Sequence, residues 1–188
     1  MAQFETYNLD TVNDEGRKTL ENIDKGYGFV PNLLGTMIES PATTNAYLAL
    51  GKLFGETSLS AGEQQVILLT ASRINECEYC VSAHSTVARK AALPDDVVDA
   101  IRDDQPIADE RLEALRQFVA QTVKQRGWLE NEQIEAFLGA GFTRAQVFEV
   151  ILGVSMKTIS NYINHIAGPE LDEAFAADAW YAPREAVA

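Results

Sequence analysis

The chain has 188 residues, of which 46% are hydrophobic and 23% charged, an ordinary composition for a globular protein with a sizeable core. Its formal net charge of −13 repels phosphate backbones, which argues against nucleic-acid binding. No apolar run approaches the roughly 20 residues that span a bilayer, so no membrane partner is expected. The N-terminal stretch 1–5 lacks the basic and apolar regions of a signal peptide, which predicts a cytoplasmic location.

Segments that favour helix follow one another along the chain. Residues 26–34 place two glycines and a proline among apolar side chains, which predicts a tight connection leading into a short helix. The alternative for this segment is a lid over a pocket. A proline at the first helical position predicts a helix over 41–54. Ser60 and Glu63 have the spacing of a capping box and open a helix over 60–75.

The second half of the chain continues this pattern. A short helix over 94–101 and a helix with one apolar face over 108–126 are expected, followed by another short helix over 130–140. A second capping box begins at Thr143. The longest apolar-periodic segment follows over 147–166 and is ended by a Gly-Pro pair.

These signals predict an all-α helical bundle, because no alternating β-branched runs joined by a turn occur. We expect a single domain over 1–188, with residues 1–30 as an extension and 60–92 as its core. Capping boxes precede both of the most apolar helices, which leaves two pseudo-symmetric helical halves as an open alternative.

The most informative stretch is CEYCVSAH over 77–84. It holds the only two cysteines, Cys77 and Cys80, and one of the two histidines, His84. Steps of three, four and seven residues return to nearly the same face of a helix, so all three groups would point the same way. The plainer alternatives are two small buried hydrophobic residues or half of a metal site. The in-phase histidine and the reducing cytoplasm instead favour thiols that cycle in redox or nucleophilic chemistry.

A thiolate, not a thiol, attacks a peroxide O–O bond or a disulfide, and free cysteine has a pKa of about 8.5. A helix that begins near Cys77 would lower the pKa of that thiol, whereas His84 lies one turn after Cys80 and favours Cys80 as the nucleophile. Glu76 and Glu78 oppose an anion at Cys77. From the residues alone, the choice of nucleophile stays open.

Residues 76–84, with the pattern ECxYCxxAH, resemble the alkylhydroperoxidase AhpD/carboxymuconolactone decarboxylase superfamily. The segment LSAGEQQ over 59–65 and the apolar helix after it fit the same pattern. Residues 28–33 and 146–165 resemble parts of its peroxidase-related members, so the likeness covers roughly residues 25–175. The resemblance implies an all-helical, AhpD-like homo-oligomer that needs no metal or other cofactor.

The resemblance also implies a thiol-dependent hydroperoxide reductase of the peroxiredoxin type. Cys80 would attack the hydroperoxide and become a sulfenic acid, and Cys77 would condense with it to a disulfide. His84 would belong to the relay that forms the thiolate and protonates the leaving alkoxide. A dithiol donor, either a lipoyl protein or a thioredoxin-like reductant, would restore the two thiols.

One position departs from the family pattern. Well-characterised members carry a glutamate twelve residues before the first cysteine, and this chain has Gln65 there. Glutamine can hold a hydrogen bond but cannot take up a proton near neutral pH. Glu149 is a lone carboxylate inside the apolar run 147–152 and would supply the missing group. An ion pair or an exposed position on the helix is the alternative for Glu149.

Two rival interpretations of the dithiol remain. One is a protein-disulfide oxidoreductase without peroxide specificity, and the other is a non-catalytic redox-sensing or metal-binding module. His165 could complete a zinc set with both cysteines and His84, although a histidine that interacts with the last carbonyls of its helix is the simpler interpretation. We therefore predict catalytic roles for Cys80, Cys77 and His84, and a metal-free site.

Overall fold

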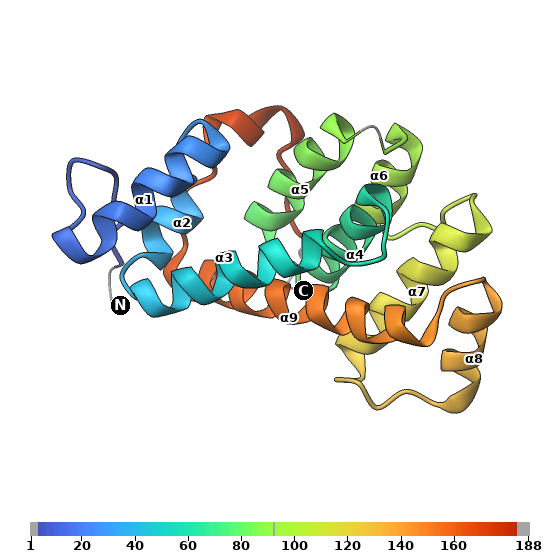
Figure 1. Ribbon diagram of the computed structural model, residues 1–188. Helices are drawn as coiled ribbons and strands as arrows, with labels where there is room; N and C mark the ends of the chain where they lie inside the picture. The colour runs from blue at the N-terminus through green and yellow to red at the C-terminus, as the bar shows by residue number, and fades with distance from the viewer. Residues whose placement is uncertain (1–3, 92, 184–188) are drawn as a thin grey trace, which may run out of the picture.

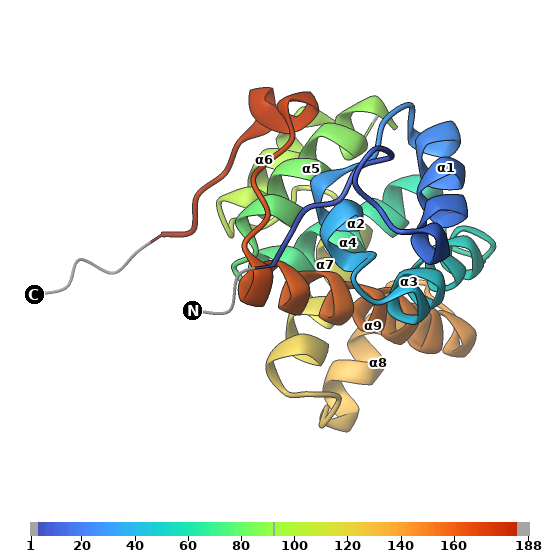
Figure 2. The ribbon, with the colours of Figure 1, turned by 90° about the vertical axis from the view of Figure 1, so that its left-hand side faces the viewer.

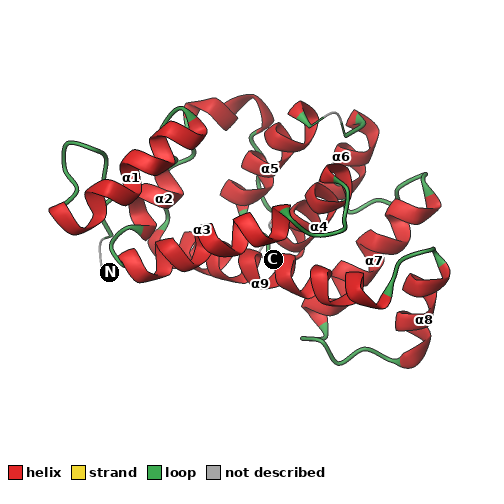
Figure 3. Ribbon diagram, viewed as in Figure 1, coloured by secondary structure: helices red, strands yellow, loops and turns green. Residues whose placement is uncertain are grey.

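Residues 4–91 and 93–183 are described in a computed structural model, and every regular element within them is a helix (Figures 1 and 3). This confirms the all-α prediction. No single described helix is long and apolar enough to cross a membrane. The helices Asn131–Gly139 and Arg144–Ala167 meet that criterion only together, as a pair bent by 108°. The elements are α1 (Asp14–Tyr27), α2 (Asn32–Met37), α3 (Pro41–Gly55), α4 (Ala61–Ile74), α5 (Glu78–Lys90), α6 (Asp95–Arg102), α7 (Glu110–Lys124), α8 (Asn131–Gly139), α9 (Arg144–Ala167) and the 3₁₀-helix η1 (Glu173–Asp178).

Helix α4 lies at the centre of the bundle because it is apolar on several sides. Val66, Ile67 and Leu69 are all fully buried, a pattern typical of a helix surrounded by others. It packs against α5, α6, α7 and α9. The expected capping box is formed, with the Ser60 hydroxyl accepting from the Glu63 amide and the Glu63 carboxylate accepting from the Ser60 amide.

The long helix α9 runs beside α3 along one edge of the bundle (Figure 1). It approaches α3 and α4 closely at Gly153, where a Cβ would lie only 2.8 Å from Ile67 and from the ring of Phe54. Thr143 forms the capping box that begins α9. The helix ends at Gly168, which adopts a left-handed φ of 61° as the Gly-Pro pair predicted. This close packing brings the inner face of α9 over α4 and α5.

The helices predicted after residue 40 all occur, with ends shifted by three residues at most. The tight connection over 26–34 is also found, because Gly28 ends α1 and α2 follows at Asn32. Helix α1 was missed by the sequence analysis. The Asn13 side chain caps it, and Leu20 and Ile23 bury its apolar face.

The C-terminal segment folds back across α5 (Figure 2), and the sequence analysis predicted no element there. The Asp172 carboxylate accepts hydrogen bonds from the Asn32 amide and from the Tyr79 hydroxyl, which ties this segment to α2 and α5. Farther along, the Trp180 amide donates to Ser82 Oγ at 3.0 Å. These contacts place the C-terminal segment beside the start of α5, where both cysteines lie.

Candidate active site

The junction of α4 and α5 places both thiols at the beginning of α5. Helix α4 ends at Ile74 with Asn75 as its C-cap, and Glu76 adopts a φ of 54°, an uncommon conformation for a residue with a side chain. The Cys77 amide then donates to Ser72 O at 3.0 Å. Cys77 is the N-cap of α5 and Cys80 lies in its first turn, each with 1% of its surface exposed. The unpaired N–H groups of this helix start favour an anion nearby.

A polar stripe on α9 faces the two sulfur atoms. Lys157, Ser160 and Asn164 follow at steps of three and four residues and are all buried. Asn164 Nδ2 lies 3.1 Å from Cys80 Sγ and 3.5 Å from Cys77 Sγ. Ser160 Oγ lies 3.9 Å from Cys80 Sγ. The Asn164 amide therefore holds both sulfurs on one side and can donate to a thiolate.

Lys157 supplies a buried positive charge beside Cys80. Only 1% of its surface is exposed, and within the described residues it forms no ion pair with a carboxylate. Burial disfavours the ammonium form, but the negative charge that Cys80 carries raises the pKa of Lys157 above its ordinary value. A buried lysine needs a partner to stay charged, and here the partner is the Cys80 thiolate.

The two thiols ionise very differently. Burial raises the pKa of Cys80, but the hydrogen bond from the Cys77 thiol and the charge of Lys157 together outweigh it and lower that pKa to about 5. The hydrogen bond to Cys80, burial and the Cys80 charge raise the pKa of Cys77 far above its ordinary value. At neutral pH Cys80 is therefore a thiolate and Cys77 a thiol. This asymmetry favours Cys80 as the nucleophile, the choice that the residues alone left open.

His84 contacts Lys157 and Gln65. Lys157 Nζ lies 2.9 Å from His84 Nε2, and Gln65 Oε1 lies 3.2 Å from His84 Nδ1. Burial, and then the charge of Lys157, lower the pKa of His84 well below its ordinary value, so the imidazole is neutral. An ammonium group can only donate, so Nε2 accepts and Nδ1 carries the proton that Gln65 accepts. Gln65 thus orients the ring, and His84 orients Lys157.

The structure places Glu149 away from this cluster, which corrects the expectation that it replaces the relay carboxylate. Its two oxygens accept hydrogen bonds from the amide and the hydroxyl of Ser58, at 3.1 and 2.8 Å. Glu149 therefore closes the connection before α4. It is half-buried and forms no ion pair within the described residues, so the alternative of an ion pair or an exposed position is not found either. His165 is exposed, and no group of three or more His, Cys, Asp or Glu side chains within the described residues could hold a metal ion. The zinc set is thus not assembled in the described part of the chain.

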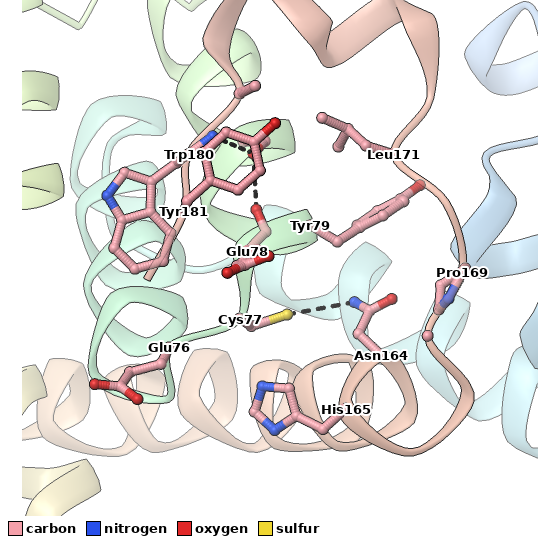
Figure 4. Close-up of a pocket in the computed structure, with 13 residues that line it drawn as sticks. Glu76, Cys77, Glu78, Tyr79, Asn164, His165, Pro169, Leu171, Trp180 and Tyr181 are labelled. Carbon is pink, nitrogen blue, oxygen red and sulfur yellow. Dashed lines mark hydrogen bonds between the residues drawn. The ribbon is translucent and has the colours of Figure 1, made fainter. Parts of the chain in front are cut away.

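Two cavities reach the dithiol, one at each sulfur-bearing residue. The Cys77 cavity has a volume of about 440 Å³, and its wall includes Cys77, Asn164, His165, Trp180 and both flanking glutamates (Figure 4). The Cys80 cavity has a volume of about 230 Å³ and adjoins Cys80, His84 and Lys157. Its remaining wall is largely apolar and aromatic, with contributions from Phe29, Leu33, Tyr47, Met156 and Phe175. The segment considered as a lid in the sequence analysis is one wall of the Cys80 cavity.

Sequence reasoning identified the thiols, His84 and Gln65 but missed the residues of α9. A signal was present, because Lys157 is the only Lys or Arg between Arg144 and the end of α9. Asn164 lies seven residues later and so on the same helix face. The signal in the sequence is therefore a single lysine in phase with an asparagine in an otherwise apolar helix.

Comparison with known proteins agrees with this architecture. Residues 41–122 match the carboxymuconolactone decarboxylase family. The fold is similar to that of an uncharacterised peroxidase-related protein from Ralstonia eutropha JMP134, described as an alkylhydroperoxidase AhpD core, with a TM-score of 0.80 and 23% identity over 92% of this chain and 93% of that one. A peroxidase-related protein from Silicibacter sp. TM1040 matches with a TM-score of 0.77 and 21% identity, over 93% and 96% of the two chains.

A third similar structure is that of the debrominase Bmp8, solved in complex with 2,3,4-tribromopyrrole. It has a TM-score of 0.75 and 18% identity over 89% of this chain and 92% of that one. None of the curated protein sequences matches the chain. At these identities the likeness to solved structures establishes the fold and leaves the activity to be argued from the site.

Proposed function

We propose that this chain, whose residues 41–122 match the carboxymuconolactone decarboxylase family, is a thiol-dependent hydroperoxide reductase. It cycles through a Cys77–Cys80 disulfide. The observation that carries the proposal is the buried Cys80 thiolate, which pairs with Lys157 and has a thiol one helical turn away at Cys77. A thiolate with a thiol partner within reach is the arrangement that peroxide reduction by a dithiol requires.

The oxidative step needs a nucleophile and a proton for the leaving oxygen. The Cys80 thiolate attacks the terminal oxygen of the hydroperoxide, an S–O bond forms, and the O–O bond breaks. The departing alkoxide takes a proton and leaves as the alcohol. Lys157 is placed to give that proton, because it adjoins the same cavity as Cys80. His84 and Gln65 hold the ammonium group in position.

The second step closes the disulfide. The Cys77 sulfur attacks the Cys80 sulfenic acid, its proton leaves with the hydroxyl group as water, and the S–S bond forms. The disulfide carries no charge, so Lys157 then has no anionic partner. Burial lowers the pKa of a lysine without a partner, and so the neutral amine persists until reduction restores the Cys80 thiolate.

The site disfavours the rival interpretations. Each cysteine is only 1% exposed, so the disulfide of a folded protein substrate cannot reach either sulfur without opening the bundle. A metal-binding module would need further ligands, and none gather at the thiols within the described residues. Cycling also needs a reducing compartment, which supports our proposal of a cytoplasmic location.

A coupled assay tests the proposal. Purified protein with dithiothreitol should consume cumene hydroperoxide or hydrogen peroxide. Cys80→Ser should abolish turnover because it removes the nucleophile. With hydroperoxide added in the absence of dithiothreitol, Cys77→Ser should form one sulfenic acid per chain and stop, because no second cysteine can condense with it. A dimedone-type reagent should label Cys80 in that variant. Labelling mainly at Cys77 in the Cys80→Ser variant would reverse the assignment of the two thiols.

A second candidate function is reductive debromination of an aromatic compound. The Cys80 cavity favours it, because Phe29, Tyr47 and Phe175 in its wall suit a flat ring. A structurally similar protein is described as a debrominase. The dithiol would supply two electrons, replace carbon–bromine with carbon–hydrogen, and release bromide. Bromide release from a bromopyrrole in the presence of dithiothreitol, with no consumption of peroxide, would favour this function over the first.

A further inference from the structure

We infer that two separate cavities give access to the dithiol. The reductant enters through the Cys77 cavity, and the oxidising substrate enters through the Cys80 cavity. The inference rests on the proposed dithiol cycle and adds a second binding site to it, for a narrow, uncharged dithiol. Cys77 adjoins the first cavity and not the second, and Cys80 adjoins the second and not the first. Each sulfur-bearing residue thus has its own route to the surface.

Tyr79 separates the two routes. It lies between the cysteines in sequence and contributes to the walls of both cavities. Its hydroxyl donates to Asp172 and accepts from the Leu33 amide at 3.3 Å, so the ring is held from two directions. Phe175 also packs edge-on against the ring, with 6.1 Å between the centroids. A side chain held in this way is a fixed partition, and a ligand in one cavity does not reach the other sulfur.

Thiol–disulfide exchange also favours attack at Cys77. The sulfur that leaves more readily is the one whose thiol has the lower pKa. Despite burial, hydrogen bonds and the charge of Lys157 lower the pKa of Cys80, whereas the hydrogen bond to Cys80, burial and the Cys80 charge raise the pKa of Cys77 against an opposing effect of Lys157. Thiol–disulfide exchange is therefore fastest when the reductant attacks Cys77 and the Cys80 thiolate leaves. The Cys77 cavity is the one that exposes the sulfur to be attacked.

The reductive half-reaction balances with one dithiol. The reductant thiolate attacks Cys77 Sγ, the Cys77–Cys80 bond breaks, and Cys80 leaves with the electron pair. The second thiol of the reductant then attacks its own mixed-disulfide sulfur and expels Cys77, which takes up a proton. The reductant becomes an intramolecular disulfide, and two electrons have passed to the protein.

The shape and charge of the Cys77 cavity select the reductant. Cys77 is buried, so the attacking thiol has to arrive on a small molecule or on a narrow arm. Glu76 and Glu78 line the cavity, in a chain of net charge −13, and both disfavour a reductant that carries a negative group, such as a carboxylate, in addition to its attacking thiolate. Asn164 also lines it, and its Oδ1 has no hydrogen-bond partner in the described residues, which leaves an acceptor for a donor on the reductant.

Two rim substitutions test the two routes separately. His165 is an exposed residue of the Cys77 cavity, and Val87 is an exposed residue of the Cys80 cavity. His165→Trp and Val87→Trp each add bulk to one opening. The disulfide is formed with diamide, so that reduction by dithiothreitol is measured whether or not the protein reduces peroxides. The oxidative half-reaction is measured as the loss of free thiols after cumene hydroperoxide is added to the reduced protein.

We expect opposite effects in the two variants. His165→Trp should slow reduction of the disulfide at least tenfold and leave thiol oxidation within twofold of the parent. Val87→Trp should slow oxidation and leave reduction within twofold. Unchanged reduction in a folded His165→Trp protein, or slowing of the same half-reaction by both variants, would overturn the inference. Loss of peroxide reactivity in the parent, with the reduction pattern intact, would remove the proposed function and not the second site.

Two further measurements do not depend on the bulky substitutions. When the diamide-oxidised protein reacts briefly with 2-mercaptoethanol and is quenched in acid, the mixed disulfide should map to Cys77, and an adduct mainly at Cys80 would contradict the inference. Dihydrolipoamide, which is neutral, should reduce the disulfide faster than dihydrolipoate, which is anionic. Glu76→Gln should narrow that difference at low ionic strength, and equal rates for the two reductants in the parent would exclude charge selection.

Discussion

At the scale of single residues, the site depends on a charge that the bundle encloses. Lys157 is buried between the Cys80 thiolate and the neutral His84. The charge of Lys157 lowers the pKa of both neighbours, and the charge of Cys80 raises the pKa of Lys157. Gln65 completes the chain by accepting the His84 Nδ1 proton. The family pattern has a carboxylate at that position. Here the positive charge comes directly from a lysine, so an acid at position 65 is not needed to form the thiolate.

The first prediction concerns the ionisation of Cys80. The thiolate absorbance at 240 nm should titrate with a midpoint near pH 5 in the parent protein. In Lys157→Met the midpoint should rise toward the ordinary value of about 8.5, because the Lys157 charge is lost and burial is then opposed only by hydrogen bonds such as the one from the Cys77 thiol. At a midpoint of about 8.5 the thiolate fraction at pH 7 is about 3%, so oxidation by hydroperoxide should slow by up to about 30-fold.

The same shift predicts a pH dependence of stability. The folded state lowers the pKa of Cys80, so its ionisation stabilises the fold above the ordinary pKa, and this contribution is lost as the pH falls toward 5.

The exposed Lys124 on α7 offers a control for the titration of Cys80 at 240 nm. Lys124→Met should leave the 240 nm midpoint unchanged. A midpoint near 5 in Lys157→Met would show that Lys157 does not stabilise the thiolate.

The second prediction concerns Gln65. Gln65→Glu would place a carboxylate 3.2 Å from His84 Nδ1 and raise the pKa of that imidazole, which is measurable from the pH dependence of its NMR signals. We expect the oxidation rate to change less than tenfold, because Lys157 already supplies the charge. Glu149→Gln, which alters only the contact with Ser58, should leave the rate unchanged. A gain of 10²-fold or more in Gln65→Glu would show that the relay lacks a carboxylate.

At the scale of elements, the position of α9 decides the site. The thiols belong to α5, but the groups that tune them lie on α9, and α9 reaches α4 through the close approach at Gly153. The inner face of α9 combines small and polar residues in an otherwise apolar helix. This combination lets the helix lie close enough for Lys157 and Asn164 to reach the start of α5.

The third prediction tests that approach. Gly153→Ala should destabilise the protein by about 1–3 kcal/mol, because the added methyl group would lie 2.8 Å from Ile67 and Phe54. This range is the cost of the steric overlap, and the gain in helix propensity, about 1 kcal/mol, offsets part of it, so the net loss should be up to about 2 kcal/mol. Gly26→Ala is the matched control, since nothing lies within 4 Å of its Cβ position, and it should be neutral or stabilising. Urea unfolding of the two variants gives the comparison. An equal increase in the free energy of unfolding of both variants would mean that α9 can move to accommodate the added methyl group without destabilising the protein.

At the scale of the whole molecule, an apolar face of α9 is left open to solvent. Phe148 and Ile166 are each 71% exposed, and Ile151 and Tyr162 lie on the same face of the helix. Figure 1 shows α9 at the edge of the bundle, where a second copy could pack against this face. We propose that the protein is a homo-oligomer that buries it, in line with the expectation from sequence.

The fourth prediction follows from that proposal. Light scattering at micromolar concentration should give a mass above that of the 20.6 kDa chain, and Phe148→Asp should shift the protein toward monomer. Trp128, which is 85% exposed outside α9, serves as a control, and Trp128→Ser should leave the mass unchanged. A parent protein that is monomeric throughout this range, or dissociation only in Trp128→Ser, would show that the α9 face is not the interface.

Local sequence alone determined most of the helices and the alignment of the two cysteines with His84. Capping residues and helical spacing act within a few residues, so Ser60, Thr143 and the CxxCxxxH motif could be interpreted without knowledge of the rest of the chain. The C-terminal segment carries no such pattern. Its course is set by distant contacts such as the one from Asp172 to the Asn32 amide, and it was not predicted.

Only the tertiary structure decided which groups ionise the thiol. Both Glu149 and Lys157 are charged residues in the same apolar helix, and from sequence either could face the cysteines. They lie eight residues apart, which separates them by about 12 Å along the helix axis and about 80° around it. The packing of α9 therefore places Glu149 beside Ser58 and Lys157 beside Cys80. The pKa of a buried group depends on its desolvation and on charges from distant parts of the chain, and neither is determined before the helices pack.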